Sequence, residues 1–320
     1  MRIIGALAIA VTIAAHTGAA AQDFPSQTVK IVVPAAPGST TDTLARLTAG
    51  GLSRKWGKPA VVENIAGGGM NIGATAVARA APDGHTLLVA PPAPFTIADL
   101  LAKDLNYSPK SFAPITMLAK ISNVLVVRKG LPANSLKELI DHAKANPGKL
   151  TYATQGPGST SHLSAAQLEG LTGIKMVAVP YRGAQLALND ILAGNVDMFF
   201  DTLATSVPLY RADKIKILAV AGLERTKTAP ELPTFPEAGV PGFRSITWFG
   251  LAAPRGIPKA LVERLNRDTV EVLRSREIGD KLANISLEVG ALSPEESAKF
   301  FDDETALWSK VIEDAGVTPQ

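Results

Sequence analysis

The sequence predicts an α/β protein in which parallel sheets are covered by helices. Short runs of β-branched and apolar residues alternate with longer helical stretches between residues 29 and 220, which is the pattern of strands joined by crossover helices. The chain has 320 residues, of which 46% are hydrophobic, so it is long enough for two domains that each bury a sizeable core. We therefore expect two α/β domains.

The first predicted strand is Val29–Val33, because this segment is almost wholly valine and isoleucine. A helix is expected from Thr41 to Trp56, since Leu44, Leu47 and Leu52 fall on one side of it. The next elements are a strand, a helix and a strand, predicted at Val61–Glu63, Ala74–Ala80 and Thr86–Val89.

Further strands recur along the middle of the chain. They are recognised by β-branched and aromatic residues between turn-forming segments, and a helix is expected between most of them, as at Ser135–Ala145. These strands are predicted at Val124–Val127, Leu150–Ala153, Met176–Val179, Val196–Phe200, Ile217–Val220 and Ile246–Ala253.

The chain from Pro258 onward is almost wholly helical, so we expect it to cover a sheet without forming a sheet of its own. A cluster of prolines and glycines at residues 228–242 interrupts the alternation, which indicates a domain border there. A weaker border is expected at residues 119–123, where two apolar runs meet. The C-terminal helices are predicted at Pro258–Arg274, Arg276–Leu282 and Pro294–Ala315.

Composition excludes several classes of function. The net charge is +3 and the charges are scattered along the chain, so nucleic acid is not an expected partner. The chain has no cysteine, which excludes disulfides, thiolate nucleophiles and iron–sulfur clusters. No two histidines have the spacing of a metal-binding motif, so we expect neither a metal nor a cofactor.

The N-terminus has the layout of a secretory signal peptide. Arg2 precedes an apolar run from Ile3 to Ala15, and Ala19-Ala20-Ala21 provides a cleavage site of small residues. The run is too short for a membrane anchor, which takes about 20 residues. We expect residues 1–21 to be removed and the mature protein to be soluble and exported.

Two similar loops are the most informative feature of the sequence. The segments 37–41 (PGSTT) and 157–161 (PGSTS) each follow a predicted strand and open a predicted helix. The first turn of a helix has unpaired N–H donors and a partial positive charge, so a hydroxyl-rich loop there can bind an anion. Neither loop contains lysine or arginine, which suits a carboxylate that must be released again. The alternative is that the hydroxyls only cap their helices.

A third loop, at residues 66–73, is rich in glycine. It lacks both the dinucleotide-binding pattern and the P-loop pattern. Its glycines therefore serve close approach of the backbone, either to a ligand or to a neighbouring segment.

Isolated polar residues give weaker indications. Ser159 and His162 are a candidate nucleophile and base, although no nucleophile elbow surrounds them. Asp201 is either a buried acceptor at a cleft or a turn former. Arg182 either reaches an anion or belongs to a solvated turn.

Six motifs follow one another along the chain, at residues 33–38 (VPAAPG), 64–74 (NIAGGGMNIGA), 81–87 (APDGHTL), 158–163 (GSTSHL), 179–183 (VPYRG) and 246–251 (ITWFGL). Together they resemble the Bug-type solute receptors of tripartite tricarboxylate transporters. The resemblance implies a periplasmic binding protein of the Venus flytrap fold, with hinge crossover strands and a helical C-terminal tail. The domains it implies are residues 22–121 with 250–320, and residues 122–249.

The resemblance also implies a ligand and partners. Receptors of this family hold a carboxylate largely through backbone amides, hydroxyls and water, and deliver it to membrane permease subunits. We expect a monomer. Carried over by position, the binding residues are Ala35, Gly38, Ser39, Thr40 and Asp42 in the first loop, Ser159, Thr160 and His162 in the second, and Asp201 on the far side of the cleft.

Two departures from the family pattern bear on the ligand. Ala35 stands where relatives often have an aromatic ring, and Ser39 stands where they usually have glycine. We therefore expect a roomy pocket for a dicarboxylate, with aromatic diacids among the candidates.

Two other functions stay open at this point. One is a periplasmic hydrolase of esters or amides that uses Ser159 and His162. The other is a ligand-loaded sensor subunit that docks on a signalling partner. A receptor of either kind binds its ligand saturably and forms no product, whereas a hydrolase turns it over.

Overall fold

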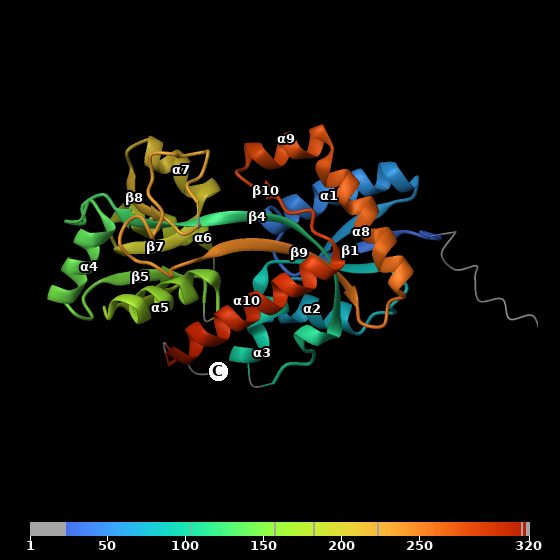
Figure 1. Cartoon of the computed structure of the whole chain (residues 1–320), viewed down its shortest axis with the longest axis horizontal. Helices are drawn as coiled ribbons and strands as arrows, with labels where there is room; N and C mark the ends of the chain where they lie inside the picture. The colour runs from blue at the N-terminus through green and yellow to red at the C-terminus, as the bar shows by residue number, and fades with distance from the viewer. Residues whose placement is uncertain are drawn as a thin grey trace, which may run out of the picture.

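The computed structural model describes residues 24–317 apart from Lys103, Pro157, Arg182, Leu223 and Ala315. The predicted signal peptide, Pro157 of the second loop and Arg182 thus lie outside the described residues. Figure 1 shows two lobes side by side along the long axis of the molecule, joined by two long strands.

The first lobe is built on three parallel strands, since β1 pairs with β2 on one side and with β3 on the other. Helix α1 buries Leu44 and Leu52 and ends at Gly57, whose left-handed conformation (φ 63°) caps it. The elements are β1 (Val29–Val33), α1 (Thr40–Trp56), β2 (Ala60–Asn64), the 3-10 turn η1 (Gly68–Met70), α2 (Asn71–Ala78), β3 (Thr86–Ala90), the π-helical turn η2 (Ala93–Ile97), α3 (Ala98–Leu101) and the 3-10 turn η3 (Pro109–Ser111).

The second lobe repeats this plan, with β5 parallel to β6 on one side and to β7 on the other. Its elements are α4 (Leu136–Ala145), β5 (Thr151–Thr154), α5 (Thr160–Thr172), β6 (Val177–Pro180), α6 (Ala184–Ala193), β7 (Met198–Thr202), α7 (Leu203–Arg211) and β8 (Ile215–Val220). The strands predicted in both lobes are confirmed to within about two residues at most ends.

Two strands, β4 (Phe112–Arg128) and β9 (Ile246–Pro254), run between the lobes (Figure 1). They pair antiparallel from Phe112 to Ser122, and β4 then continues into the second lobe beside β7 and β8. The border predicted at residues 119–123 falls where β4 changes partners, from β9 up to Ser122 to β7 from Asn123 onward, although the strand itself runs through without a break.

The two lobes share one strand order. It is β2-β1-β3-β9-β4 in the first and β6-β5-β7-β4-β8 in the second. In each case an antiparallel crossover strand follows the three parallel strands. The two similar loops follow β1 and β5, the middle strands of the parallel sets. The similarity of their sequences therefore reflects equivalent positions in two related lobes.

The C-terminal segment contains α8 (Lys259–Arg274), α9 (Arg276–Asn284), β10 (Glu288–Val289) and α10 (Pro294–Asp314). Its short strand β10 pairs with β4 at Ala119 and Lys120, so the segment adds an edge strand to an existing sheet, and its described residues form no sheet of their own. Helix α10 packs against both lobes. Its side chains Trp308, Val311 and Ile312 share a buried cluster with Ile97 of η2 and with Leu163 and Ala166 of α5.

The proline-rich segment 228–242 does not lie between the lobes. Phe235 and Val240 belong to the buried core of the second lobe, and the ring of Phe235 stacks on that of Phe243 with centroids 3.8 Å apart. The domain border predicted there is therefore wrong, since apolar side chains anchor the segment inside one lobe.

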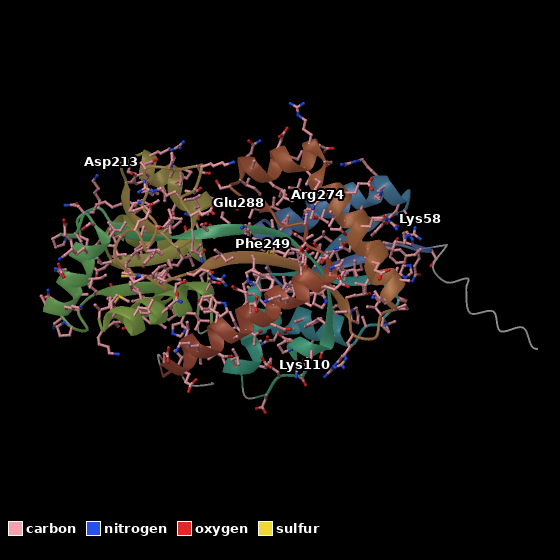
Figure 2. All side chains as sticks on the ribbon, viewed as in Figure 1. Lys58, Lys110, Asp213, Phe249, Arg274 and Glu288 are labelled. Atoms are coloured by element: carbon pink, nitrogen blue, oxygen red, sulfur yellow. The ribbon has the colours of Figure 1, made fainter. Side chains whose placement is uncertain are left out.

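Side chains fill the space between the sheets and their helices (Figure 2). Phe249 of β9 is buried at the middle of the molecule, whereas the charged side chains of Lys58, Lys110 and Asp213 lie at its periphery. No helix within the described part of the chain is long and apolar enough to cross a membrane.

Candidate functional site

The two similar loops lie at the point in each lobe where ligands bind in open α/β sheets. Each follows the middle strand of a lobe, from which the chain passes first to one neighbouring strand and later to the other. The carboxyl end of such a strand is the topological switch point, and crevices for ligands form there. The fold thus places both loops where a ligand site is expected.

The first loop is organised by two hydrogen bonds. Gly38 has a positive φ of 80°, a conformation that glycine adopts without steric cost. Its N–H donates to Asp42 Oδ2 at 2.9 Å, and the N–H of Asp42 donates to the hydroxyl of Ser39 at 3.2 Å. Ser39 is the N-cap of α1, and Thr40 is the first residue of that helix.

The second loop has the same geometry. Gly158 has a φ of 74°, and its N–H donates to Nδ1 of His162 at 3.2 Å. The N–H of His162 donates to the hydroxyl of Ser159, the N-cap of α5, at 3.3 Å. Asp42 and His162 therefore hold equivalent positions, and each accepts a hydrogen bond within its own loop.

The N–H groups of the first helical turn remain as donors. Ser39 and Ser159 satisfy the amides three and four residues on with their hydroxyl and carbonyl oxygens. The amides of Thr40, Thr41, Thr160 and Ser161 have no acceptor among the described residues, because the first residues of a helix have no preceding turn. Capping therefore leaves these amides available to an anion. The interpretation of the loops as helix caps and their interpretation as an anion site are thus compatible.

Charge is balanced at the first loop. Asp42 is buried, and it accepts hydrogen bonds from Arg46 Nε (3.0 Å) and Asn64 Nδ2 (3.0 Å) besides Gly38. Burial alone would raise the pKa of Asp42, but these hydrogen bonds, from Arg46 above all, hold the pKa below its usual value. Asp42 is therefore a carboxylate paired with a cation and does not repel an anionic ligand strongly.

His162 retains one ring nitrogen, Nε2, outside the hydrogen bonds of its loop. Burial lowers the pKa of His162, so its ring is neutral at neutral pH. Because Nδ1 accepts from Gly158, the proton of the neutral ring lies on Nε2. His162 can thus donate one hydrogen bond to a carboxylate without carrying charge.

Ser159 and His162 do not form a nucleophile–base pair. The hydroxyl of Ser159 donates to the carbonyl of Gly156 at 2.7 Å, and the ring nitrogen Nδ1 is bound to Gly158. A hydrolase of this type needs a hydrogen bond from the hydroxyl to the ring. The geometry is that of an ordered loop that caps the start of α5.

Asp201 belongs to neither loop: it is the second-to-last residue of β7, close to the start of α7. It is buried and accepts hydrogen bonds from Ser206 at 2.7 Å and from Thr205. Burial raises the pKa of Asp201 above its usual value. Of the two roles considered, it is a buried acceptor, and its hydroxyl partners hold it at the carboxyl end of the sheet.

Several partners of the predicted residues carry no signal in the sequence. Asn64 is the last residue of β2, and its side-chain amide donates to both Asp42 and the carbonyl of Ala35. Ser159 is joined by Thr154 and Ser161 through hydroxyl contacts of 3.1 and 3.0 Å. The spacing of Arg46 four residues after Asp42 is a signal that could have been read, since this is the spacing of a helical ion pair.

Three surface cavities lie elsewhere. They measure 1040 Å³ between α1 and α8, 380 Å³ between β10 and residues 224–228, and 290 Å³ between α2 and residues 104–106. None of the three is lined by a predicted binding residue. Among the described residues no group of histidines and carboxylates is arranged to hold a metal ion.

Comparison with known proteins places the chain in a family. Residues 44–317 match the family model described as the tripartite tricarboxylate transporter family receptor, TctC. Protein BugT of Bordetella pertussis (strain Tohama I / ATCC BAA-589 / NCTC 13251) is 31% identical over 318 residues, covering 99% of this chain and 97% of BugT.

Solved structures of similar sequence have the same fold. The structure of Rpa4515 from R. palustris with adipate is 38% identical with a TM-score of 0.85, covering 93% of this chain and 100% of that one. MatC (Rpa3494) from Rhodopseudomonas palustris with bound malate is 35% identical with a TM-score of 0.81, covering 90% and 100%. Proteins of this family are solute receptors without enzymatic activity, which excludes the hydrolase. The chain belongs to the tripartite tricarboxylate transporter family of receptors.

Proposed function

We propose that this receptor binds a small dicarboxylate between its two lobes in the periplasm and delivers it to membrane permease subunits. The observation that carries the proposal is the pair of equivalent loops, at Gly38–Thr40 and Gly158–Thr160, at the switch points of the two lobes. Two loops with free amides and hydroxyls suit two carboxylate groups. Relatives solved with adipate and with malate support this ligand class.

The proposed binding groups follow from the geometry of each loop. The amides and hydroxyls of Thr40 and Thr160 take no part in the capping hydrogen bonds, and Nε2 of His162 adds a neutral donor. Ser39 and Ser159 shape the loops as caps, Asp42 orders the first loop, and Asp201 orders the carboxyl end of β7. Ala35 leaves room at the first loop, which favours bulky diacids.

The proposed moving bodies are residues 22–121 with 250–320, and residues 122–249. Both boundaries lie in or beside the crossover strands β4 and β9, so closure requires these strands to bend. We further propose that the receptor acts as a monomer and that its signal peptide is cut after Ala21. The N-terminal sequence of the exported protein, expected to begin at Gln22, tests the cleavage.

A thermal-shift screen of mono- and dicarboxylates tests the proposed ligand. A ligand that binds only the folded state stabilises it by about 2.7 kcal/mol at one hundred times its dissociation constant. We expect a dicarboxylate to raise the melting temperature in a concentration-dependent way. The variant with both Thr40→Val and Thr160→Val is the matched control and should lose most of the shift. A screen in which no carboxylate shifts the unchanged chain would contradict the proposal.

Competition binding between a dicarboxylate and a monocarboxylate tests whether both ends of the ligand are recognised. If both loops bind a carboxylate, a monocarboxylate of equal size leaves one set of donors unpaired, which costs about 1–3 kcal/mol. We expect the affinity for the dicarboxylate to be roughly tenfold or more higher than that for the monocarboxylate. Equal affinity would show that only one end is recognised. If an Ala35→Phe variant binds aromatic diacids with unchanged affinity, the small side chain of Ala35 is not what makes room for them.

A further inference from the structure

The two similar loops share their internal geometry, but the rest of the molecule covers them differently. At the first loop, a Cβ atom on Gly38 would meet no described atom within 4 Å beyond its chain neighbours. At the second loop, a Cβ atom on Gly158 would lie 2.7 Å from Cδ1 of Leu101 and 3.4 Å from Cγ2 of Ile97. Ile97 ends η2 and Leu101 ends α3, both in the first lobe. The second loop is therefore in contact with the opposite lobe.

Helices α1 and α5, which begin at the two loops, differ on one face. A residue of α5 lies 120 positions after its counterpart in α1, because the two loops are separated by that number. Arg46 of α1 is exposed, whereas its counterpart Ala166 is buried. Thr43 is half-buried, and its counterpart Leu163 is fully buried. This face of α5 is thus covered, whereas the same face of α1 is open.

The cover is the C-terminal helix α10, which lies along both lobes (Figure 1). Its first half is attached to the first lobe. The hydroxyl of Ser297 accepts a hydrogen bond from the N–H of Met117 at 3.1 Å, and the ring of Phe301 stacks on that of Phe95 with centroids 5.1 Å apart. Its second half is attached to α5, against which Trp308 is fully buried. Helix α10 therefore joins the lobes in addition to β4 and β9.

A buried carboxylate fixes the middle of α10. Glu304 is 1% exposed, and it accepts hydrogen bonds from Nε1 of Trp248 at 3.0 Å and from the guanidinium of Arg244. The backbone N–H of Arg244 donates to the side chain of Gln167 in α5 at 3.4 Å. A buried charge is stable only when it is paired. These contacts therefore hold α10 at one position along η2 and α5.

The two loops are thus held in place by different means. The first has the ion pair of Asp42 with Arg46, within its own lobe. The second has His162 in the place of Asp42 and Ala166 in the place of Arg46, so this ion pair has no equivalent there. Apolar side chains of η2 and α3 lie against the second loop instead.

We propose, on the basis of the proposed function, that Ile97 and Leu101 are positioning residues that hold the second loop in its binding conformation from the opposite lobe. They contact Gly158, whose N–H is hydrogen-bonded to His162. They therefore act on the donors of the loop and through these on the solute. Helix α10 keeps η2 and α3 in place for this contact. The second carboxylate site is composite, built by both lobes, whereas the first is built by one.

Amide hydrogen exchange of the ligand-free protein tests the positioning role directly. In the variant Leu101→Ala, exchange at residues 158–163 should become faster, because the hydrogen bonds of this loop lose their apolar support. Exchange at residues 38–43 should not change. Leu105→Ala is the matched control, because Leu105 is also half-buried but packs in a cluster of the first lobe, and it should affect neither loop. Leu101→Met conserves volume and should keep the exchange slow.

A double-mutant cycle tests the effect on binding. Calorimetry uses the linear dicarboxylate, from malonate to suberate, that the unchanged chain binds most tightly. Leu101→Ala should lower the affinity about threefold or more through the loop. Its effect should overlap with that of Thr160→Val, because both act on the second loop, and should add to that of Thr40→Val in the first loop.

The outcomes separate the two proposals. Unchanged exchange at residues 158–163 in Leu101→Ala, or additive effects of Leu101→Ala and Thr160→Val, would overturn the inference and leave the proposed function intact. A loss of affinity in Leu105→Ala as large as in Leu101→Ala would also overturn it, because the effect would then belong to this region of the first lobe in general. No binding of any diacid to the unchanged chain would overturn the proposed function and this inference with it. Melting curves of each variant show that it is folded.

Discussion

The hydroxyl of Ser164 on α5 lies 2.6 Å from the hydroxyl of Ser245, the residue that precedes β9, and both are buried. Ser245 Oγ also accepts a hydrogen bond from Nδ2 of Asn123 in β4 at 2.8 Å. One small hydroxyl therefore joins the two crossover strands and a helix of the second lobe. Polar groups this deep in a protein are stable only when they are paired.

Ser245→Ala should destabilise the protein by about 1–3 kcal/mol, because the amide of Asn123 loses its acceptor in a buried place. Chemical denaturation at neutral pH measures the change. Ser26→Ala, at an exposed serine, is the control and should leave stability within about 0.5 kcal/mol. Equal stability of Ser245→Ala and the unchanged chain would mean that Asn123 finds another partner.

Ser159→Ala and Thr160→Val should have different effects. Ser159 caps α5, so its removal should cost about 1 kcal/mol of stability. In the proposed site the hydroxyl of Thr160 binds the ligand, so its removal should reduce affinity roughly tenfold to a hundredfold while leaving stability nearly unchanged. Calorimetry on the best ligand together with melting curves separates the two. Unchanged affinity in Thr160→Val would leave that residue without a binding role.

Asp42→Asn should destabilise the first loop at neutral pH by about 1–3 kcal/mol, since the charged acceptor of Gly38, Arg46 and Asn64 is lost. The pKa of Asp42 is lower in the folded protein than its ordinary value of 3.8. Its stabilising effect is therefore fully present above that value and disappears as the pH falls through the lowered pKa. Denaturation curves from pH 7 down to pH 3 should show the two proteins converging at the acid end.

The stability of Asp201→Asn should depend on pH in the opposite way to that of Asp42→Asn. Burial raises the pKa of Asp201 in the folded protein above the ordinary value of 3.8, so the folded state holds the proton more tightly than the unfolded state. The unchanged chain then loses stability as the pH rises from about 4 through the raised pKa. The asparagine variant lacks this loss, and its stability relative to the unchanged chain should increase over that range. A constant difference between the two would contradict the assignment.

Ligand binding should bring the lobes together, because a solute held by both loops stabilises only the closed arrangement. Small-angle scattering at saturating ligand should give a smaller radius of gyration than without ligand. The Thr40→Val and Thr160→Val double variant at the same ligand concentration provides the control. Identical curves for the unchanged chain with and without ligand would rule out hinge closure, although binding itself could persist.

The local features of the fold could be predicted from the sequence because their causes are local. Gly38 and Gly158 supply the left-handed conformation before each helix, and the serines that follow supply the caps. These requirements involve residues within one turn, so two loops of the same composition adopt the same structure. The alternation of strands and helices is predictable for the same reason.

Features that depend on distant partners could not be predicted. Lys120, Ser122 and Asn123 interrupt the apolar run at residues 119–123, yet β4 continues through them, because Asn123 is hydrogen-bonded to Ser245 and Thr247 from another part of the chain. Strand β10 has only two residues and no apolar run, and it exists because the edge of β4 is available to it. Asn64 binds Asp42 from 22 positions away, a contact that no spacing rule predicts.

The unbroken course of β4 through both lobes has a mechanical consequence. A hinge made of a flexible loop lets two bodies rotate freely, whereas a paired strand of 17 residues can bend only by changing its twist. Its register shifts after Pro114, Met117 and Leu125 concentrate that change at a few points. Under the proposed closure, β4 has to bend at these points, and the elastic strain of a paired strand opposes closure. In the proposed cycle this strain favours opening once the solute has left, so the strand that joins the lobes also helps to return them to their starting arrangement.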